Sequence, residues 1–265
     1  MGERHILVTN DDGIGADALP PLAEALASVG TVEIIVPERN WSGASHSITL
    51  FRPLRVRATK LRDGHPAHMT DGSPTDCVRL AALGFLRHRP DLVVSGINRG
   101  ANMGDDITYS GTVAAAMEGL LSNIPSIAIS IGAFGGDIDY GPAASFAALL
   151  AGNILTHGFP PDALLNVNVP PLPRDRILGV EVTRLGKRTY RDQLIERLDP
   201  YGNPYYWVGG PAVSEDAAPG TDVAAMRAGK ISVTPISLDL TDHALVADLV
   251  SWDWGWSAPL EVGTD

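Results

Sequence analysis

Short runs of aliphatic residues alternate with amphipathic segments along the first two thirds of the chain. Five runs are apolar almost throughout and predict buried strands: HILVT (5–9), TVEIIVP (31–37), DLVVSG (91–96), SIAISI (126–131) and LLNVNVP (164–170). The segments 18–30, 73–86, 111–122 and 144–155 predict helices, and Ser73 or Thr75 is the expected cap of the second one. Apolar strands separated by helices indicate an α/β fold, with a mostly parallel sheet covered on both faces.

The pattern changes after residue 176. Residues 177–210 alternate polar and apolar side chains around a YGNP turn, which predicts antiparallel strands or a projecting hairpin of the kind that often makes oligomer contacts. Residues 222–241 predict a helix, a glycine and a last strand, whereas the tryptophan-rich tail, 252–265, has no clear period. We therefore treat 1–265 as one domain, with a core at 1–180 that carries the site and an arm and C-terminal oligomerisation extension at 181–265.

Charge and cysteine content restrict the possible partners. The chain has 31 acidic and 20 basic residues, a net charge of -11, which disfavours binding to a nucleic-acid duplex. The single cysteine, Cys77, cannot form an intramolecular disulfide, and its apolar surroundings suggest a buried side chain. No run has the length of a signal peptide or a membrane span. These features predict a cytoplasmic protein without a membrane partner.

Two adjacent acids follow the first strand in ILVTNDDGIGADA, at Asp11 and Asp12. The same stretch contains a match to the dinucleotide fingerprint G-x-G-x-x-A, and Glu38 lies roughly where the ribose-binding acid is expected, about 20 residues on. However, a pyrophosphate at this turn would face two carboxylates, at a cost of several kcal/mol per contact at about 4 Å. A divalent cation bound to both acids would remove the conflict. Since Asp-Gly is also a common turn pair, the stretch alone leaves both readings open.

Two further loops carry polar residues where strands are expected to end. ERNWSGASHSITL follows the second strand with several small hydroxyl-bearing residues. The strand at 91–96 is followed by Asn98 and Asn102 in a glycine-rich loop, and then by Ser110, Gly111 and Thr112 at the start of a helix. Amide oxygens can bind a hard cation, and the free N–H groups of a helix start favour an anion. The ends of these strands therefore predict a metal and phosphate site.

The motifs TNDDGIGADAL, PERNWSGASHSIT, TDGSPTDCV, SGINRGANMGDDITYSGTVAAAMEG and ISVTPIS occur in the order seen in the SurE family, and the chain resembles that family over nearly its whole length. These are metal-dependent 5'-nucleotidases of the survival-protein-E type, which are acid phosphatases. The resemblance implies a Rossmann-like α/β core with a C-terminal part that builds homodimers or homotetramers. Trp41 stands where the family often has glutamine, and it could alter access or nucleoside preference.

Carried over residue by residue, the resemblance places one divalent metal ion per subunit on Asp11, Asp12, Ser42 and Asn98. It also places Asn102, Ser110, Gly111 and Thr112 near the phosphate of the substrate. An all-oxygen ligand set suits Mg²⁺ or Mn²⁺ better than zinc.

The predicted reaction is hydrolysis of nucleoside monophosphates to nucleoside and inorganic phosphate, with Asp11, Asp12 and Asn98 as the catalytic residues. The resemblance also allows 3'-nucleotides and short polyphosphate as substrates. Two alternatives remain: an oxidoreductase that binds a nucleotide cofactor through GIGADA, and a non-catalytic nucleotide-binding or assembly protein.

Overall fold

A nine-stranded mixed sheet forms the core of the computed structural model, which describes residues 3–160, 163–190, 193–210, 212–215 and 217–255. The strand order is β3-β4-β2-β1-β5-β6-β7-β13-β8. The strands are β1 His5–Thr9, β2 Thr31–Pro37, β3 Val56–Lys60, β4 Pro66–Thr70, β5 Leu92–Arg99, β6 Ser126–Ile131, β7 Leu164–Val169, β8 Val180–Val182 and β13 Ile231–Ile236. From β4 to β7 all neighbours are parallel, while β3 and β13 run antiparallel to β4 and β7. The predicted mostly parallel α/β fold is confirmed.

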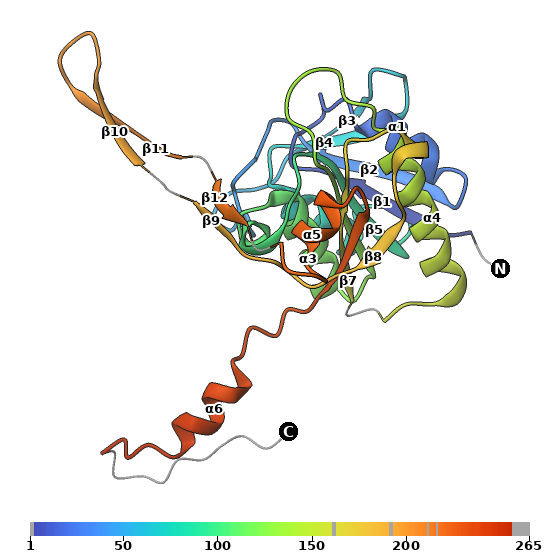
Figure 1. Cartoon of the computed structure of the whole chain (residues 1–265). Helices are drawn as coiled ribbons and strands as arrows, with labels where there is room; N and C mark the ends of the chain where they lie inside the picture. The colour runs from blue at the N-terminus through green and yellow to red at the C-terminus, as the bar shows by residue number, and fades with distance from the viewer. Residues whose placement is uncertain (1–2, 161–162, 191–192, 211, 216, 256–265) are drawn as a thin grey trace.

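Helices cover both faces of this sheet, as Figure 1 shows. They are α1 Leu19–Leu26, α2 Pro74–Ala82, α3 Gly111–Leu121, α4 Gly141–His157 and α5 Asp222–Arg227, with 3-10 turns at Gly104–Thr108 and Arg174–Arg176. A further helix, α6 His243–Val250, lies apart from the sheet. Successive side chains of a strand point to opposite faces. Ile6 and Val8 of β1 accordingly pack with α1 and α4, whereas Leu7 packs with α2 and α3. The three layers follow from this alternation.

The start of α2 shows how local sequence sets an element boundary. Ser73 caps the helix: its hydroxyl accepts a hydrogen bond from the backbone N–H of Asp76, whose carboxylate in turn accepts one from the N–H of Ser73. Pro74 fills the first turn, where no N–H is needed. Thr75, the other candidate cap, is fully buried instead, and its hydroxyl has no hydrogen-bond partner within the described residues.

Several elements had no sequence prediction, among them β3, β4 and α6. The strand β3 reads VRATK, lies at the edge of the sheet and is largely exposed, so it carries no apolar run. Its partner β4 is equally short and mixed. The helix α6 has no buried residue and lies away from the core (Figure 1).

The predicted arm is an antiparallel hairpin that projects from the body of the molecule (Figure 1). Its strands are β10 Gln193–Leu198 and β11 Pro204–Gly209, and β9 Arg188–Tyr190 pairs with β12 Ala212–Glu215 closer to the core. Residues 222–236, which the sequence analysis grouped with this extension, form α5 and β13 and pack on the core. Of the tail, Trp252 and Trp254 are exposed, and residues 256–265 lie outside the described part.

A search of the described residues finds no helix that is long and apolar enough to cross a membrane.

Candidate active site

The predicted site residues gather where three neighbouring strands end. Asp11 and Asp12 follow β1, Ser42 lies in the loop after β2, and Asn98 is the next-to-last residue of β5. Because β1 pairs with both β2 and β5 in parallel, their carboxyl ends lie at one edge of the sheet. Residues 102 and 110–112 reach the same edge through the loop between β5 and α3.

Two adjoining cavities occupy this edge. One, of about 260 Å³, is lined by Asp11, Ser42, Gly43, Asn98, Arg99, Asn102, Asp106, Tyr109 and Ser110. The other, of about 320 Å³, is lined by Asp12, Gly15, Ala16, Asp17, Asn40, Arg99 and Tyr140. The guanidinium-bearing residue Arg99 lines both. Of the eight site residues predicted from the sequence, only Gly111 and Thr112 line neither cavity.

The carboxylate of Asp11 lies against the start of α3. Asp11 is 3% exposed, and its Oδ1 accepts a hydrogen bond of 2.6 Å from the hydroxyl of Thr112, which is fully buried. A Cβ on Gly111 would come within 2.7 Å of the Asp11 Cβ, so glycine permits this close approach. Burial raises the pKa of Asp11, and the Thr112 hydroxyl and the backbone N–H groups of residues 111 and 112 oppose that rise. In the structure, Gly111 and Thr112 thus hold Asp11; their predicted contact with phosphate stays a prediction.

Asp12 faces the neighbouring cavity and is held by the second loop. Its Oδ1 accepts a hydrogen bond of 3.1 Å from the Asn40 side chain. Burial raises the pKa of Asp12, and the nearby carboxyl of Asp11 raises it further, while Arg99 acts in the opposite direction. Two acids that are both costly to ionise lie side by side, which is the electrostatic situation that a bound cation relieves.

The turn after β1 explains why adjacent acids reach one edge. The Asn10 side chain donates to the carbonyl of Gly13 and accepts from its N–H, at 3.1 Å each. Gly13 has φ +85°, and a Cβ there would lie 2.9 Å from the backbone of Arg39. The N–H of Trp41 donates to the carbonyl of Asp11 at 2.7 Å, which docks the second loop on the first. The chain has therefore left the strand before the acids, so they need not point to opposite faces.

Asn40 also connects Asp12 to Ser42. Its Oδ1 accepts a hydrogen bond of 2.7 Å from the Ser42 N–H, while its Nδ2 donates to Asp12. Further along the loop, the Ser45 hydroxyl donates to the carbonyl of Thr108 at 2.6 Å. The second loop is thereby fixed to both of the others. Sequence reasoning did not select Asn40, although it lies inside the quoted motif.

The third loop supplies amide and hydroxyl groups. The Nδ2 of Asn98 donates to the carbonyl of Gly100 at 2.8 Å, which leaves its Oδ1 as the oxygen donor available to a cation. Asn102 donates from Nδ2 to the Ser130 hydroxyl at 2.9 Å. The Ser110 hydroxyl caps α3 by accepting from the N–H of Val113.

Two acids outside the predicted set stabilise the loop that carries Asn102. Asp106 is ion-paired with Arg188 of β9 at 2.6 Å. Asp222, at the start of α5, is fully buried and accepts hydrogen bonds from the N–H groups of Gly104 and Gly186, at 2.9 and 2.8 Å. The root of the arm is therefore tied to the site loop. No local sequence signal marks these contacts, because each joins residues far apart in the chain.

The donor set fits a hard divalent cation. Within the described ranges, no group of three His, Cys, Asp or Glu side chains is placed to hold a metal ion. The candidate ligands are instead two carboxylates, an amide oxygen and a hydroxyl, which are the oxygen donors that Mg²⁺ and Mn²⁺ accept.

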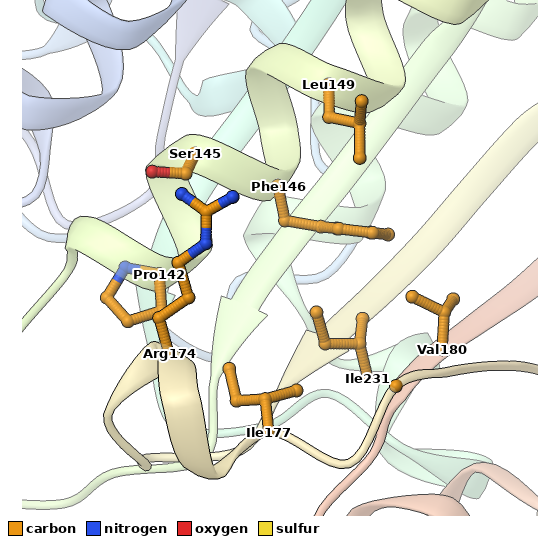
Figure 2. Close-up of a pocket in the computed structure, with 9 residues that line it drawn as sticks. Pro142, Ser145, Phe146, Leu149, Arg174, Ile177, Val180 and Ile231 are labelled. Carbon is orange, nitrogen blue, oxygen red and sulfur yellow. The ribbon is translucent and has the colours of Figure 1, made fainter.

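Other cavities lie elsewhere. Figure 2 shows one of about 240 Å³, lined mainly by apolar side chains of α4 and of the segment after β7, such as Phe146 and Ile177, with Arg174 extending across it. A larger one, of about 680 Å³, lies between α3, the 3-10 turn Gly104–Thr108 and the end of β13. Its lining is mostly apolar, and Met117 and Leu185 are among its residues.

The fold and the site define a Rossmann-like α/β protein with a site rich in oxygen donors at the carboxyl edge of its sheet. The family model of Survival protein SurE matches residues 6–192. The chain therefore belongs to the SurE family.

Relatives and a solved structure agree with this assignment. The chain is 47% identical over 251 residues to the 5'-nucleotidase SurE of Chloroflexus aggregans, covering 94% of this chain and 99% of that protein. It is 50% identical to the 5'-nucleotidase SurE of Herpetosiphon aurantiacus, covering 94% and 98%. The crystal structure of SurE protein from Aquifex aeolicus matches with a TM-score of 0.79 and 41% identity, covering 92% of this chain and 98% of that one.

Proposed function

We propose that this protein is a metal-dependent phosphomonoesterase that hydrolyses nucleoside 5'-monophosphates to nucleoside and inorganic phosphate. One observation carries the proposal: two adjacent carboxylates, the buried Asp11 and the partly buried Asp12, lie with the Oδ1 of Asn98 at one sheet edge beside polar donors suited to an anion. The names of the relatives from Chloroflexus aggregans and Herpetosiphon aurantiacus support the same activity.

The proposed division of roles follows from the contacts. Asp11, Asp12, Asn98 and Ser42 would hold one Mg²⁺ or Mn²⁺, which supplies Lewis-acid polarisation of the phosphoryl group when bound. Thr112 holds the Asp11 carboxylate in one orientation, and Asn40 does the same for Asp12. Asp11 or Asp12 would orient or deprotonate the attacking water.

Neutral and cationic donors complete the proposed phosphate site. Ser110 and Asn102 line the same cavity as Asp11, so a hydroxyl and an amide can donate to phosphoryl oxygens there. Arg99, which lines both cavities, can offset negative charge that builds on the transferred group. Water attacks phosphorus and gives up a proton, the bond to the ester oxygen breaks, and the leaving alkoxide takes up a proton from solvent, so that the nucleoside and inorganic phosphate are formed.

The structure gives little support to the dinucleotide alternative. In that fingerprint the helix starts at the glycines and presents its N–H groups to the pyrophosphate. Here α1 starts only at Leu19, after a segment of turns at residues 14–18. Glu38, the expected ribose-binding acid, is ion-paired with Arg57 at 2.9 Å.

The deciding experiment measures phosphate release from a panel of nucleoside monophosphates, with Mn²⁺ or Mg²⁺ and with EDTA. We expect release that requires the metal and is lost in Asp12→Asn. The matched control is Asp175→Asn, which removes an exposed carboxyl in the 3-10 turn Arg174–Arg176 and should keep full activity. Absence of release with every metal, from a folded protein, would reject the proposal. The same panel, extended to 3'-monophosphates and short polyphosphate, would define the substrate range.

We further propose that the arm and α6 form contacts between subunits of a homodimer or homotetramer. Support comes from exposed aromatic and aliphatic side chains on both: Trp207 is 66% exposed on the arm, and Trp252 is 58% exposed just after α6. Light scattering on the full chain and on Trp207→Ser tests this proposal. The cytoplasmic location stays a prediction from the sequence.

A further inference from the structure

Asn168 binds both backbone polar groups of Asn102. Its Oδ1 accepts the N–H of Asn102 at 2.8 Å, and its Nδ2 donates to the carbonyl of Asn102 at 2.9 Å. Asn168 is fully buried in β7, where the preceding and following residues, Val167 and Val169, belong to the main hydrophobic cluster. A side chain thus pairs with one residue of a loop in the way that a neighbouring strand would.

Two more buried groups complete this contact. Asn166, two residues earlier on the same face of β7, donates a second hydrogen bond of 2.9 Å to the Asn102 carbonyl. Ser130, the register partner of Asn168 on β6, accepts from the side chain of Asn102 at 2.9 Å. The backbone and the side chain of Asn102 are therefore both held by buried groups of the sheet.

These three polar groups lie in an apolar part of the sheet, where polar side chains are not expected without a reason. On this face of the sheet, the neighbouring Ala128 and Leu164 belong to an apolar cluster with α3. Burying two amides and a hydroxyl there is costly unless each finds a partner. The Nδ2 groups of both asparagines and the Ser130 hydroxyl all pair with Asn102, which lines the cavity beside Asp11, while the Oδ1 of Asn166 has no hydrogen-bond partner within the described residues.

We propose that Asn168 is a positioning residue of the phosphate site, which acts through Asn102 with Asn166 and Ser130 in support. Asn168 fixes the backbone of Asn102, and Ser130 then limits the side chain to one rotamer that faces the cavity. The metal ligands Asp11 and Asp12 are held separately, through Thr112 and Asn40. The inference rests on the proposed function in that Asn102 contacts the phosphate. It predicts that phosphate binding can be weakened without weakening metal binding.

The test uses the full chain and calorimetry with inorganic phosphate, at saturating Mn²⁺, alongside titrations with Mn²⁺ alone. Asn168→Leu keeps the size of the side chain but removes both hydrogen bonds. Ser130→Ala removes only the acceptor for the Asn102 side chain. The matched control is Ser232→Ala on β13: Ser232 is fully buried beside Asn168 in the sheet, but its hydroxyl pairs with Thr183.

We expect Asn168→Leu to weaken phosphate binding at least tenfold and Ser130→Ala several-fold, with Mn²⁺ affinity within twofold of the parent in both. The control should leave both affinities within twofold. Equal loss of phosphate and Mn²⁺ affinity, or unchanged phosphate affinity in both variants, would overturn the inference. If Asn168→Leu does not fold, Ser130→Ala decides alone. A parent protein that binds phosphate but releases none from nucleotides would reject the proposed function and leave this test intact.

Discussion

Replacing Thr112 with valine removes one hydroxyl from a fully buried position and leaves the shape of the side chain nearly unchanged. That hydroxyl donates to the Asp11 carboxylate at 2.6 Å, so the variant leaves a buried charged oxygen without this donor. A hydrogen bond to a charged group contributes about 1.5–3 kcal/mol to stability. For a protein of this size, each kcal/mol corresponds to about 2–4 °C in Tm. We therefore expect metal-free Thr112→Val to melt roughly 3–12 °C below the parent.

The chain offers a matched control for this substitution. Thr75 is also fully buried, but its hydroxyl has no hydrogen-bond partner within the described part of the chain. Thr75→Val should therefore melt at the parent temperature or above it, since it removes a buried polar group that nothing satisfies. Differential scanning calorimetry of both variants in EDTA measures the difference. If the two melt together, the hydrogen bond to Asp11 does not contribute as argued.

Three further predictions concern single side chains. Gly111→Ala should weaken Mn²⁺ binding at least tenfold by calorimetry, because the new Cβ would lie 2.7 Å from the Cβ of Asp11; unchanged affinity would show that α3 can shift without cost. Arg99→Met should lower both kcat and kcat/KM for the nucleotide in steady-state assays, since it removes the guanidinium proposed to offset charge that builds on the transferred group, and a raised KM with unchanged kcat would contradict that role. Burial raises the pKa of the Cys77 thiol far above its usual range, so a thiol reagent at pH 8 should label it only after unfolding in guanidinium chloride; rapid labelling of the native protein would contradict the buried position.

The sequence was most informative where burial is continuous along the chain. The strands β1, β5, β6 and β7 are buried over most of their length, and their aliphatic runs predicted them closely. Edge strand β3 gave no such signal, because only its tertiary pairing with β4 makes VRATK a strand. A pattern of apolar residues detects strands that are buried on both faces of the sheet. It misses an edge strand whose conformation depends on pairing with one neighbouring strand.

The same limit applied to the site. Asp11 and Asp12 come just after β1 and Asn98 lies at the end of β5, so strand prediction alone brought them to one edge. The contacts that hold them are long-range: Thr112 lies 101 residues from Asp11, and Asn168 lies 66 residues from Asn102. The paired asparagines of LLNVNVP were a visible signal, since burying an amide is costly unless it is hydrogen-bonded. Their partner could not be identified without the fold.

The chain leaves the core for the arm and returns to it at nearly the same point. Arg184 bridges to Thr221, its N–H donates to the carbonyl of Gly220 at 2.9 Å, and its carbonyl accepts from the N–H of Asp222 at 3.0 Å. These hydrogen bonds hold the two ends of the segment between Arg184 and Thr221 together at the base of the arm, and they do so whatever the length of that segment. Because the entropy of closing a loop rises only slowly with the number of residues, this base is a natural graft point. Evolution or design can lengthen, shorten or exchange the arm there while the sheet stays intact.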